Sequence, residues 1–219
     1  MYNFGLLLKM IPLILKLKKA RHKEIAKAQD LIVESLYSVF NNAVLHGGTS
    51  IWRCYKGNRF SEDIDVYIVK DKNKIDSLFE EFEKKGFKIE KKKVSENSIY
   101  SSLNFNNTFV RFEAVFKKER GILREYETAE GNLITVFTLS SEQLIKEKVS
   151  AYLKRLKIRD LYDIFFLLKY ADVKEVKDNL KKLIKEFKKP IDEPDLKIII
   201  LEGLIPSADN MLNYINSRI

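Results

Sequence analysis

Two short stretches of the sequence combine residue types that suit phosphate and metal chemistry. The first is a pair of glycines with two hydroxyl residues behind them: Gly47, Gly48, Thr49 and Ser50. Glycines let the backbone turn sharply and bring free N–H groups close to an anion, which the dipole of a following helix also favours. The two hydroxyls add further donors, so this stretch predicts a cradle for phosphate.

The second stretch follows about a dozen residues later, where Asp63 and Asp65 open a β-rich run over 63–69. Alternate residues of a strand point to the same face, so these carboxylates are predicted to lie about 7 Å apart along one face. They can then share Mg²⁺, a hard cation that prefers carboxylates, water and substrate phosphates. The two stretches together predict a site for a nucleoside triphosphate with its metal, in which Mn²⁺ is a possible substitute for Mg²⁺.

A third carboxylate is expected on a neighbouring strand, where it completes the metal site or takes a proton from the nucleophile. The best candidate is Glu113, which alternates with the apolar Phe112 and Ala114 and therefore lies on the opposite face of its strand. The alternative is an ordinary solvated residue paired with Arg111 or another neighbour. The sequence leaves both interpretations open.

Composition excludes several other chemistries. One cysteine in 219 residues rules out an internal disulfide, and two histidines leave too few ligands for an ordinary zinc site. The same scarcity argues against Cys-His and Ser-His catalysis. No G-x-x-x-x-G-K-[ST], G-x-G-x-x-G or H-R-D motif is present, so the P-loop and kinase solutions to phosphate binding are absent.

The formal net charge is +9, and residues 1–30 carry five of these charges, with seven basic and two acidic residues. This is a weak indication of a polyanionic partner, and a lysine-rich solvated surface is the alternative. The apolar run from Phe4 to Leu17 is too short to span a bilayer and lacks the features of a secretory signal. We therefore expect a cytoplasmic protein with no membrane partner.

Hydrophobic periodicity predicts an α+β protein: a mixed sheet flanked by helices, then a helical C-terminal domain. A helix ending at 41–42 comes first, then a short strand at 43–45, the glycine turn, a short helix and the strand at 63–69. The later elements are a helix at 73–85, strands at 87–94, 99–105, 109–117 and 133–138, and helices at 141–155, 159–170, 173–188 and 195 to the end. The change of pattern after Thr138 predicts two domains, 1–139 and 140–219.

The residues of both halves resemble one known family. The run over 45–65, from Leu45 to Asp65, looks like the signature of the AbiEii abortive-infection toxins, which belong to the DNA polymerase β-like nucleotidyltransferases. A second block is similar to the family's second motif: Lys148-Val149-Ser150-Ala151, then Arg155, then Arg159 to Asp163. The resemblance covers roughly residues 25 to 170, with both blocks in the family's order.

The resemblance implies a role for each matching residue. The triphosphate would be held by Gly47, Gly48, Thr49 and Ser50, with Arg59 and Ser61 close to the nucleotide, and the metal by Asp63 and Asp65. Lys148 would reach the β- and γ-phosphates, and Asp160 or Asp163 would complete the pocket from the helical half. The alternative for the second block is structural, since Arg159 and Asp163 are four residues apart on one helix and can simply pair.

These observations predict a Mg²⁺-dependent transfer of a nucleoside monophosphate from an NTP to a hydroxyl acceptor. The resemblance implies a toxin of a toxin–antitoxin pair, with a cognate antitoxin protein as partner and RNA, such as the tRNA 3′ end, as acceptor. The basic residues of the first helix would then guide this acceptor. The alternatives are a nucleotide-binding regulatory module without turnover and a small-molecule nucleotidyltransferase of the antibiotic-modifying kind.

Overall fold

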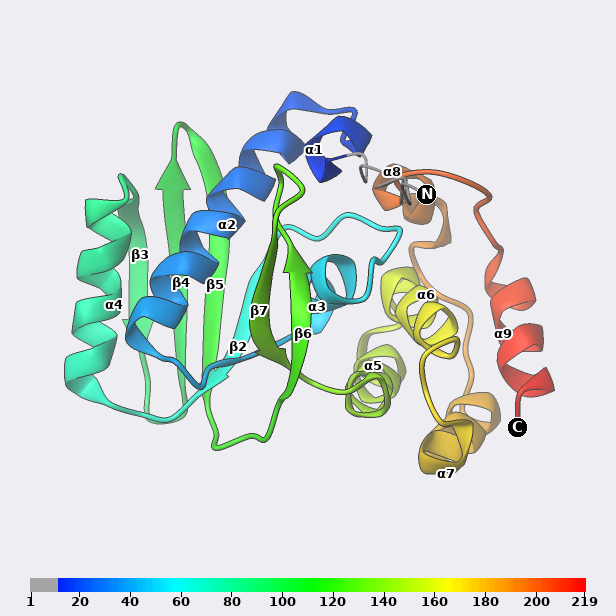
Figure 1. Cartoon of the computed structure of the whole chain (residues 1–219). Coiled ribbons are helices and arrows are strands. Elements are labelled where there is room, and N and C mark those ends of the chain that lie inside the picture. Colours follow the sequence, from blue (N-terminus) through cyan, green and yellow to red (C-terminus); the bar gives the residue numbers. More distant parts are fainter. Residues whose placement is uncertain (1–11) are drawn as a thin grey trace, which may run out of the picture.

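One mixed β-sheet organises the first part of the chain in the computed structural model, which describes residues 12–219 (Figure 1). The strands lie in the order β3-β4-β5-β2-β1-β7-β6. Their bounds are Val44–His46 (β1), Ile64–Ile68 (β2), Lys88–Val94 (β3), Ser98–Phe105 (β4), Thr108–Phe116 (β5), Ile122–Glu127 (β6) and Leu133–Thr138 (β7). The β2–β5 and β1–β7 pairs are parallel, and the other neighbouring strands are antiparallel.

Among the described residues, four helices from the first part of the chain flank this sheet. They are α1 (Leu13–Lys16), α2 (Ala20–Val39), α3 (Gly47–Cys54) and α4 (Lys72–Lys84). Helices α2 and α4 lie side by side and cover the β3-β4-β5 part of the sheet (Figure 1). The buried stripe of α2 includes Ile25, Ala28, Ile32 and Leu36, which recur at the spacing that the sequence predicted.

The two central strands bury one face and leave polar residues on the other. In β2, Ile64, Val66 and Ile68 are buried while Asp65 and Tyr67 alternate with them. In β5, Val110, Phe112 and Ala114 are buried while Arg111 and Glu113 alternate with them. Because a strand has a period of two, the same pattern that packs the core also presents these polar side chains together on the opposite face.

Helices dominate after β7, as the sequence predicted. They are α5 (Ser141–Arg155), α6 (Ile158–Leu167), α7 (Val173–Lys185), η1 (Glu193–Asp195), α8 (Leu196–Ile199) and α9 (Ala208–Ser217), and the four longest gather at one end of the molecule (Figure 1). Helix α5 begins with a capping box, in which Ser140 and Gln143 each bond the other's backbone N–H. The predicted mixed α+β fold with helices at the C-terminal end is confirmed.

Two elements differ from the prediction. Strand β6 was not predicted, because it lies at the edge of the sheet with Ile122 and Leu123 exposed and therefore lacks a clear buried alternation. The helix predicted from 195 to the end is divided: after α8 the chain turns at Gly203, with φ +86°, and a new helix begins behind the Ser207 cap. Glycine and proline at 203 and 206 account for this break.

The divided C-terminal segment returns to the first half of the chain. Ile200 forms a β-bridge with Arg59, the Phe60 N–H donates to Ile199 O, and the Leu201 N–H donates to Asn58 O.

The proposed domain boundary at residue 139 stays a prediction. The start of the predicted apolar run, from Phe4, lies outside the described residues. Over 12–219, no helix is both long enough and apolar enough to cross a membrane.

Candidate active site

The first glycine of the predicted cradle is held directly against Asp65. Residue His46 of β1 is paired with Asp65 of β2, and Gly47 follows as the first residue of α3. Gly47 has φ +70°, and a Cβ atom at this position would collide with the Asp65 carboxylate. Only glycine meets both conditions without strain. The start of α3, with its unpaired backbone N–H groups, therefore lies beside a carboxylate of the predicted metal pair.

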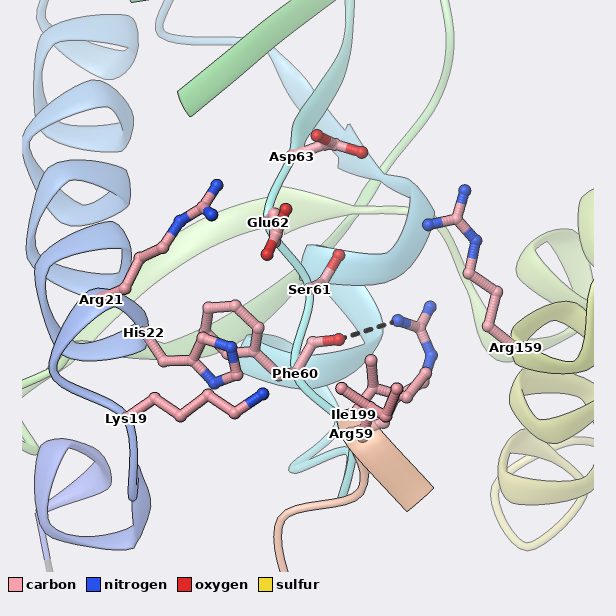
Figure 2. Close-up of a pocket in the computed structure, with 11 residues that line it drawn as sticks. Lys19, Arg21, His22, Arg59, Phe60, Ser61, Glu62, Asp63, Arg159 and Ile199 are labelled. Atoms are coloured by element: carbon pink, nitrogen blue, oxygen red, sulfur yellow. Dashed lines mark hydrogen bonds between the residues drawn. The ribbon is translucent and has the colours of Figure 1, made fainter. Parts of the chain in front are cut away.

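The second glycine makes room for two other predicted site residues. A Cβ atom on Gly48 would lie 2.5 Å from Ser61 Oγ and 2.6 Å from Arg59 Nη2. Glycine at this position therefore allows the loop that carries Arg59 and Ser61 to pack on the start of α3. Ser61 and Asp63 also line a cavity of about 390 Å³ that opens beside this loop (Figure 2).

The two hydroxyl residues of the cradle make bonds within the protein. Both side chains are about 1% exposed. Thr49 Oγ1 donates to the backbone O of Asp63 at 2.5 Å, and Ser50 Oγ lies 2.5 Å from Thr138 Oγ1. Their placement thus gives no support to the predicted contact with a triphosphate. These hydroxyls instead attach α3 to β7 and to the residue that precedes β2.

Three carboxylates come from adjacent parallel strands. Asp65 of β2 is in register with Glu113 of β5, and Asp63 immediately precedes β2. Arg111 of β5 lies between two of them: its Nη2 bonds Asp63, and its Nε is 2.9 Å from Glu113 Oε1. Both interpretations of Glu113 are therefore partly met, since it pairs with Arg111 and is also a neighbour of the predicted metal ligands.

The electrostatics of these carboxylates favour a cation. The Asp65 carboxylate makes no hydrogen bond or ion pair with another described residue. Burial raises its pKa and Asp63 adds to the rise, while His46 and Lys148 oppose it. Burial also raises the pKa of Glu113, against the opposing effect of Arg111, and the two aspartates raise it further. Burial and the neighbouring carboxylates therefore both disfavour the ionised forms of Asp65 and Glu113, and a bound cation would offset both effects.

The donor set fits Mg²⁺ in its chemistry. Carboxylates from Asp63, Asp65 and Glu113 are hard oxygen ligands of the kind that this ion prefers. Within residues 12–219, however, no three acidic, histidine or cysteine side chains are already grouped closely enough to hold a metal ion. The bond from Arg111 turns Asp63 toward the guanidinium, so binding of a metal by all three carboxylates requires Arg111 to move.

The helical half contributes a buried network of charged groups. Arg59 binds Asp163 through two contacts of 2.5 and 2.6 Å, and Lys148 Nζ lies 2.9 Å from Asp163 and 3.4 Å from Asp160. Arg155 completes the network with two contacts of 2.7 Å to Asp160. Burial alone would raise the pKa of Asp163, but Arg59 and Lys148 outweigh burial and lower it.

The second motif block had two interpretations: residues of the nucleotide pocket, or an Arg159–Asp163 pair within one helix. The network excludes the second but does not test the first. The pairing of Arg159 with Asp163 is wrong, because Asp163 binds Arg59 and Lys148 instead. Lys148 and both aspartates are buried and lie together, and the contact of Asp163 with Arg59 joins the helical half to the loop before β2. A role for Lys148 or Arg59 toward a nucleotide stays a prediction, since both cations are engaged with carboxylates.

Sequence reasoning did not include several other residues of the site. His46 stacks on Tyr67 with ring centroids 4.0 Å apart, and Glu147 accepts from the Tyr67 hydroxyl at 2.6 Å and lies 3.3 Å from His46 Nδ1. Each of these residues adjoins a predicted one in sequence or on its strand. That proximity was the only available signal, because Tyr67 and Glu147 are 80 positions apart.

Comparison with known proteins identifies the family and the fold of the chain. The chain matches the family model described as "Nucleotidyl transferase AbiEii toxin, Type IV TA system" over residues 30–207. A comparison with curated protein sequences gives no match. Among solved structures, the crystal structure of JHP933 from Helicobacter pylori is 20% identical, with a TM-score of 0.64 and coverage of 91% of this chain and 90% of that chain.

A second similar fold is the solution structure of the antibiotic-resistance factor ANT(2″)-Ia. It is 12% identical, with a TM-score of 0.50 and coverage of 74% of this chain and 92% of that chain. At these identities both structures support the fold alone. The family match, by contrast, covers most of the sequence and includes both motif blocks. The chain therefore belongs to the AbiEii toxin family and is a nucleotidyltransferase.

Proposed function

We propose that this nucleotidyltransferase transfers a nucleoside monophosphate from an NTP to a hydroxyl group of RNA, with the tRNA 3′ end as acceptor, in a Mg²⁺-dependent reaction. The observation that carries the proposal is the contact between Gly47 and Asp65. It places the start of α3, which suits phosphates, beside carboxylates that suit a metal. The register of Asp65 with Glu113 adds the third carboxylate.

In this reaction the acceptor oxygen bonds to the α-phosphorus of the NTP, and the bond from that phosphorus to the bridging oxygen breaks. Pyrophosphate leaves, and the hydroxyl proton passes to a base. Glu113 is a suitable base, because it lies in register with Asp65, and burial and the two aspartates raise its pKa against the opposing effect of Arg111. The N–H groups at Gly47 and Gly48 would bind the phosphates, with Ser61 beside them.

Asp63 and Asp65 are the residues that would hold Mg²⁺, and Mn²⁺ offers the same coordination chemistry in an assay. When bound, the ion would neutralise charge on the phosphates and help to align the nucleophile with the leaving group. Lys148 would turn from Asp163 and Asp160 toward the β- and γ-phosphates. Each of these carboxylates retains an arginine when it does so.

RNA is proposed as acceptor because its phosphates complement the +9 chain. The reaction is assigned to the cytoplasm, where NTPs and tRNA are found. As a member of a toxin family, the protein is expected to be restrained by a cognate antitoxin protein. A small-molecule acceptor is the alternative that an acceptor screen tests.

The decisive experiment incubates the full chain with Mg²⁺, each α-labelled NTP in turn, and total tRNA. We expect label in tRNA with at least one NTP. The double variant Asp63→Asn with Asp65→Asn should abolish it, because both side chains keep their shape but lose the charge that binds metal. A matched control, Asp76→Asn with Asp178→Asn, makes the same change at two exposed positions and should leave labelling intact.

Two results would overturn the proposal. One is the absence of label in RNA with every NTP, and the other is unchanged labelling in the Asp63/Asp65 variant. Label in an added aminoglycoside but not in tRNA would replace the RNA acceptor with a small molecule. Calorimetry with a non-hydrolysable NTP separates loss of turnover from loss of nucleotide binding.

A further inference from the structure

Two adjoining cavities, the first of them lined by Asp63, form a basic groove. The first, of about 390 Å³, lies between the N-terminal ends of α2 and α6 and is lined by Lys19, Arg21 and Arg159 as well as Asp63 (Figure 2). The second, of about 240 Å³, shares Lys19, His22 and Ile198 with the first and continues along Lys16, Lys18 and Lys197. We call the two together the basic groove.

The cations of this groove have no ion-pair partners among the described residues. None of the six lysine and arginine side chains named above makes an ion pair or a side-chain hydrogen bond with residues 12–219. Arg59 also lines the first cavity, but Asp163 neutralises it. The only acidic lining residues within 12–219 are Glu62 and Asp63, both in the first cavity. The groove therefore suits a ligand with several negative charges along its length.

An aromatic pair forms part of the groove wall. His22 stacks on Phe60 with ring centroids 3.8 Å apart and planes 8° from parallel, and both residues line the first cavity. Burial, Lys19 and Arg21 lower the pKa of His22 and outweigh the opposing effect of Glu62, so the ring is neutral at physiological pH. A neutral ring stacked on a second ring offers a base a surface to stack on.

From this combination we propose that the basic groove holds an unpaired terminal segment of the polynucleotide acceptor, with phosphodiesters on Lys19, Arg21 and Arg159 and a base on His22. The inference rests on the proposed function and names the path of its acceptor. The row of cations extends away from Asp63 into the second cavity, whereas the three phosphates of an NTP need only the start of α3 and its surroundings. A cavity of this size holds about one nucleotide, which favours a single strand over a duplex.

Direct binding tests this assignment without catalysis. Fluorescence anisotropy with a labelled single-stranded RNA oligonucleotide measures the affinity of the full chain at several salt concentrations. For Arg21→Gln with Arg159→Gln, we expect at least a tenfold loss of affinity. The slope of log affinity against log salt should fall by about 1.4, because each phosphate that is no longer neutralised lowers it by about 0.7. The matched control Lys181→Gln with Lys185→Gln changes exposed residues of α7 by the same charge and should weaken binding less than twofold.

A second pair of variants tests the stacking role. His22→Ala should weaken RNA binding by about fivefold or more, in line with the usual contribution of one stacked base, and His22→Phe should restore it. A blunt RNA duplex of the same sequence should bind more weakly than the single strand. Duplex binding as tight as single-strand binding, or failure of phenylalanine to restore affinity, contradicts the assignment.

A measurement of NTP binding shows whether the groove binds the RNA acceptor or the NTP donor. Calorimetry with a non-hydrolysable NTP should give the same affinity, within twofold, for the wild type and for Arg21→Gln with Arg159→Gln. Loss of NTP affinity with unchanged RNA affinity would overturn the proposal and give the groove to the donor phosphates. Equal RNA losses in the groove and control variants would overturn it as well, because the cations would then act only as general surface charge.

Failure of this inference is distinguishable from failure of the proposed function. Groove-dependent RNA binding without any labelling supports the groove and refutes the transfer reaction. Labelling of tRNA that depends on Asp63 and Asp65, with RNA affinity unaffected by groove variants, supports the reaction and refutes the groove.

Discussion

Arg111 is expected to compete with the metal ion for the carboxylates of the active site. Its guanidinium bonds Asp63 and lies 2.9 Å from Glu113, while the Asp65 carboxylate beside them has no hydrogen bond or ion pair with the described residues. Replacement by methionine removes the charge but keeps most of the length of the side chain. The variant Arg111→Met should therefore bind Mn²⁺ and Mg²⁺ more tightly than the wild type does.

The size of this effect follows from the exposure of the groups. The Arg111 side chain is 41% exposed, and Asp63 and Glu113 are 22% and 39% exposed. Partly exposed ion pairs contribute about 0.2–1 kcal/mol each, so the two pairs together oppose metal binding by roughly 0.4–2 kcal/mol. That range corresponds to about a twofold to thirtyfold lower dissociation constant for Mn²⁺ in the variant.

Mn²⁺ titration followed by electron paramagnetic resonance measures this constant without substrate, and competition extends it to Mg²⁺. Arg111→Lys keeps the charge and should remain close to the wild type. Arg120→Met makes the same substitution as the test variant at an exposed position and serves as the control. Unchanged or weaker Mn²⁺ binding in Arg111→Met would refute the reasoning and make Arg111 a support of the site rather than a competitor.

Three further predictions concern stability, each measured by thermal unfolding. Asp65→Asn should raise the melting temperature at pH 7 while it abolishes transfer. Burial raises the pKa of Asp65 in the folded state, so its ionised carboxylate lowers the stability of the folded protein at neutral pH. The gain in melting temperature should disappear below about pH 4, where Asp65 is protonated in both the folded and the unfolded state. Gly47→Ala should lower the melting temperature by several degrees, because it adds about 1–2 kcal/mol of backbone strain at φ +70° and a collision with Asp65. Arg59→Leu should cost about 3–5 kcal/mol by leaving Asp163 with only Lys148. Because the pKa of Asp163 is lowered on folding, the contribution of this carboxylate is present above its unfolded value of about 3.9 and is lost as the pH falls through the folded value. A melting temperature of Arg59→Leu equal to that of the wild type at pH 7 would contradict the last prediction.

Much of the fold, and the strands and turns that carry the site residues, could be predicted because they follow from local sequence patterns. The alternation in β5 placed Glu113 opposite the buried Phe112 and Ala114, and the structure confirms that arrangement. The glycine turn and the short helix after it are likewise as predicted. Such features depend on neighbours within a few positions, where periodicity and turn chemistry act directly.

The interactions that close the site depend on distant residues and could not be predicted. Local spacing offered Asp163 only one alternative partner, Arg159 on its own helix, but Asp163 binds Arg59, 104 positions away. Thr49 was predicted to bind phosphate from its type and place, yet its hydroxyl bonds the backbone of Asp63. In both cases tertiary packing supplied a partner that local spacing does not reveal.

The return of the C-terminal segment to the active-site loop has a consequence for biosynthesis. Residues 199–201 supply backbone partners to residues 58–60, next to Ser61 and Asp63. A nascent chain lacks these partners until residue 201 has left the ribosome, long after both motif blocks have emerged. We expect nucleotidyl transfer to begin only after that point, so chains terminated before residue 199 should be harmless to the cell that makes them.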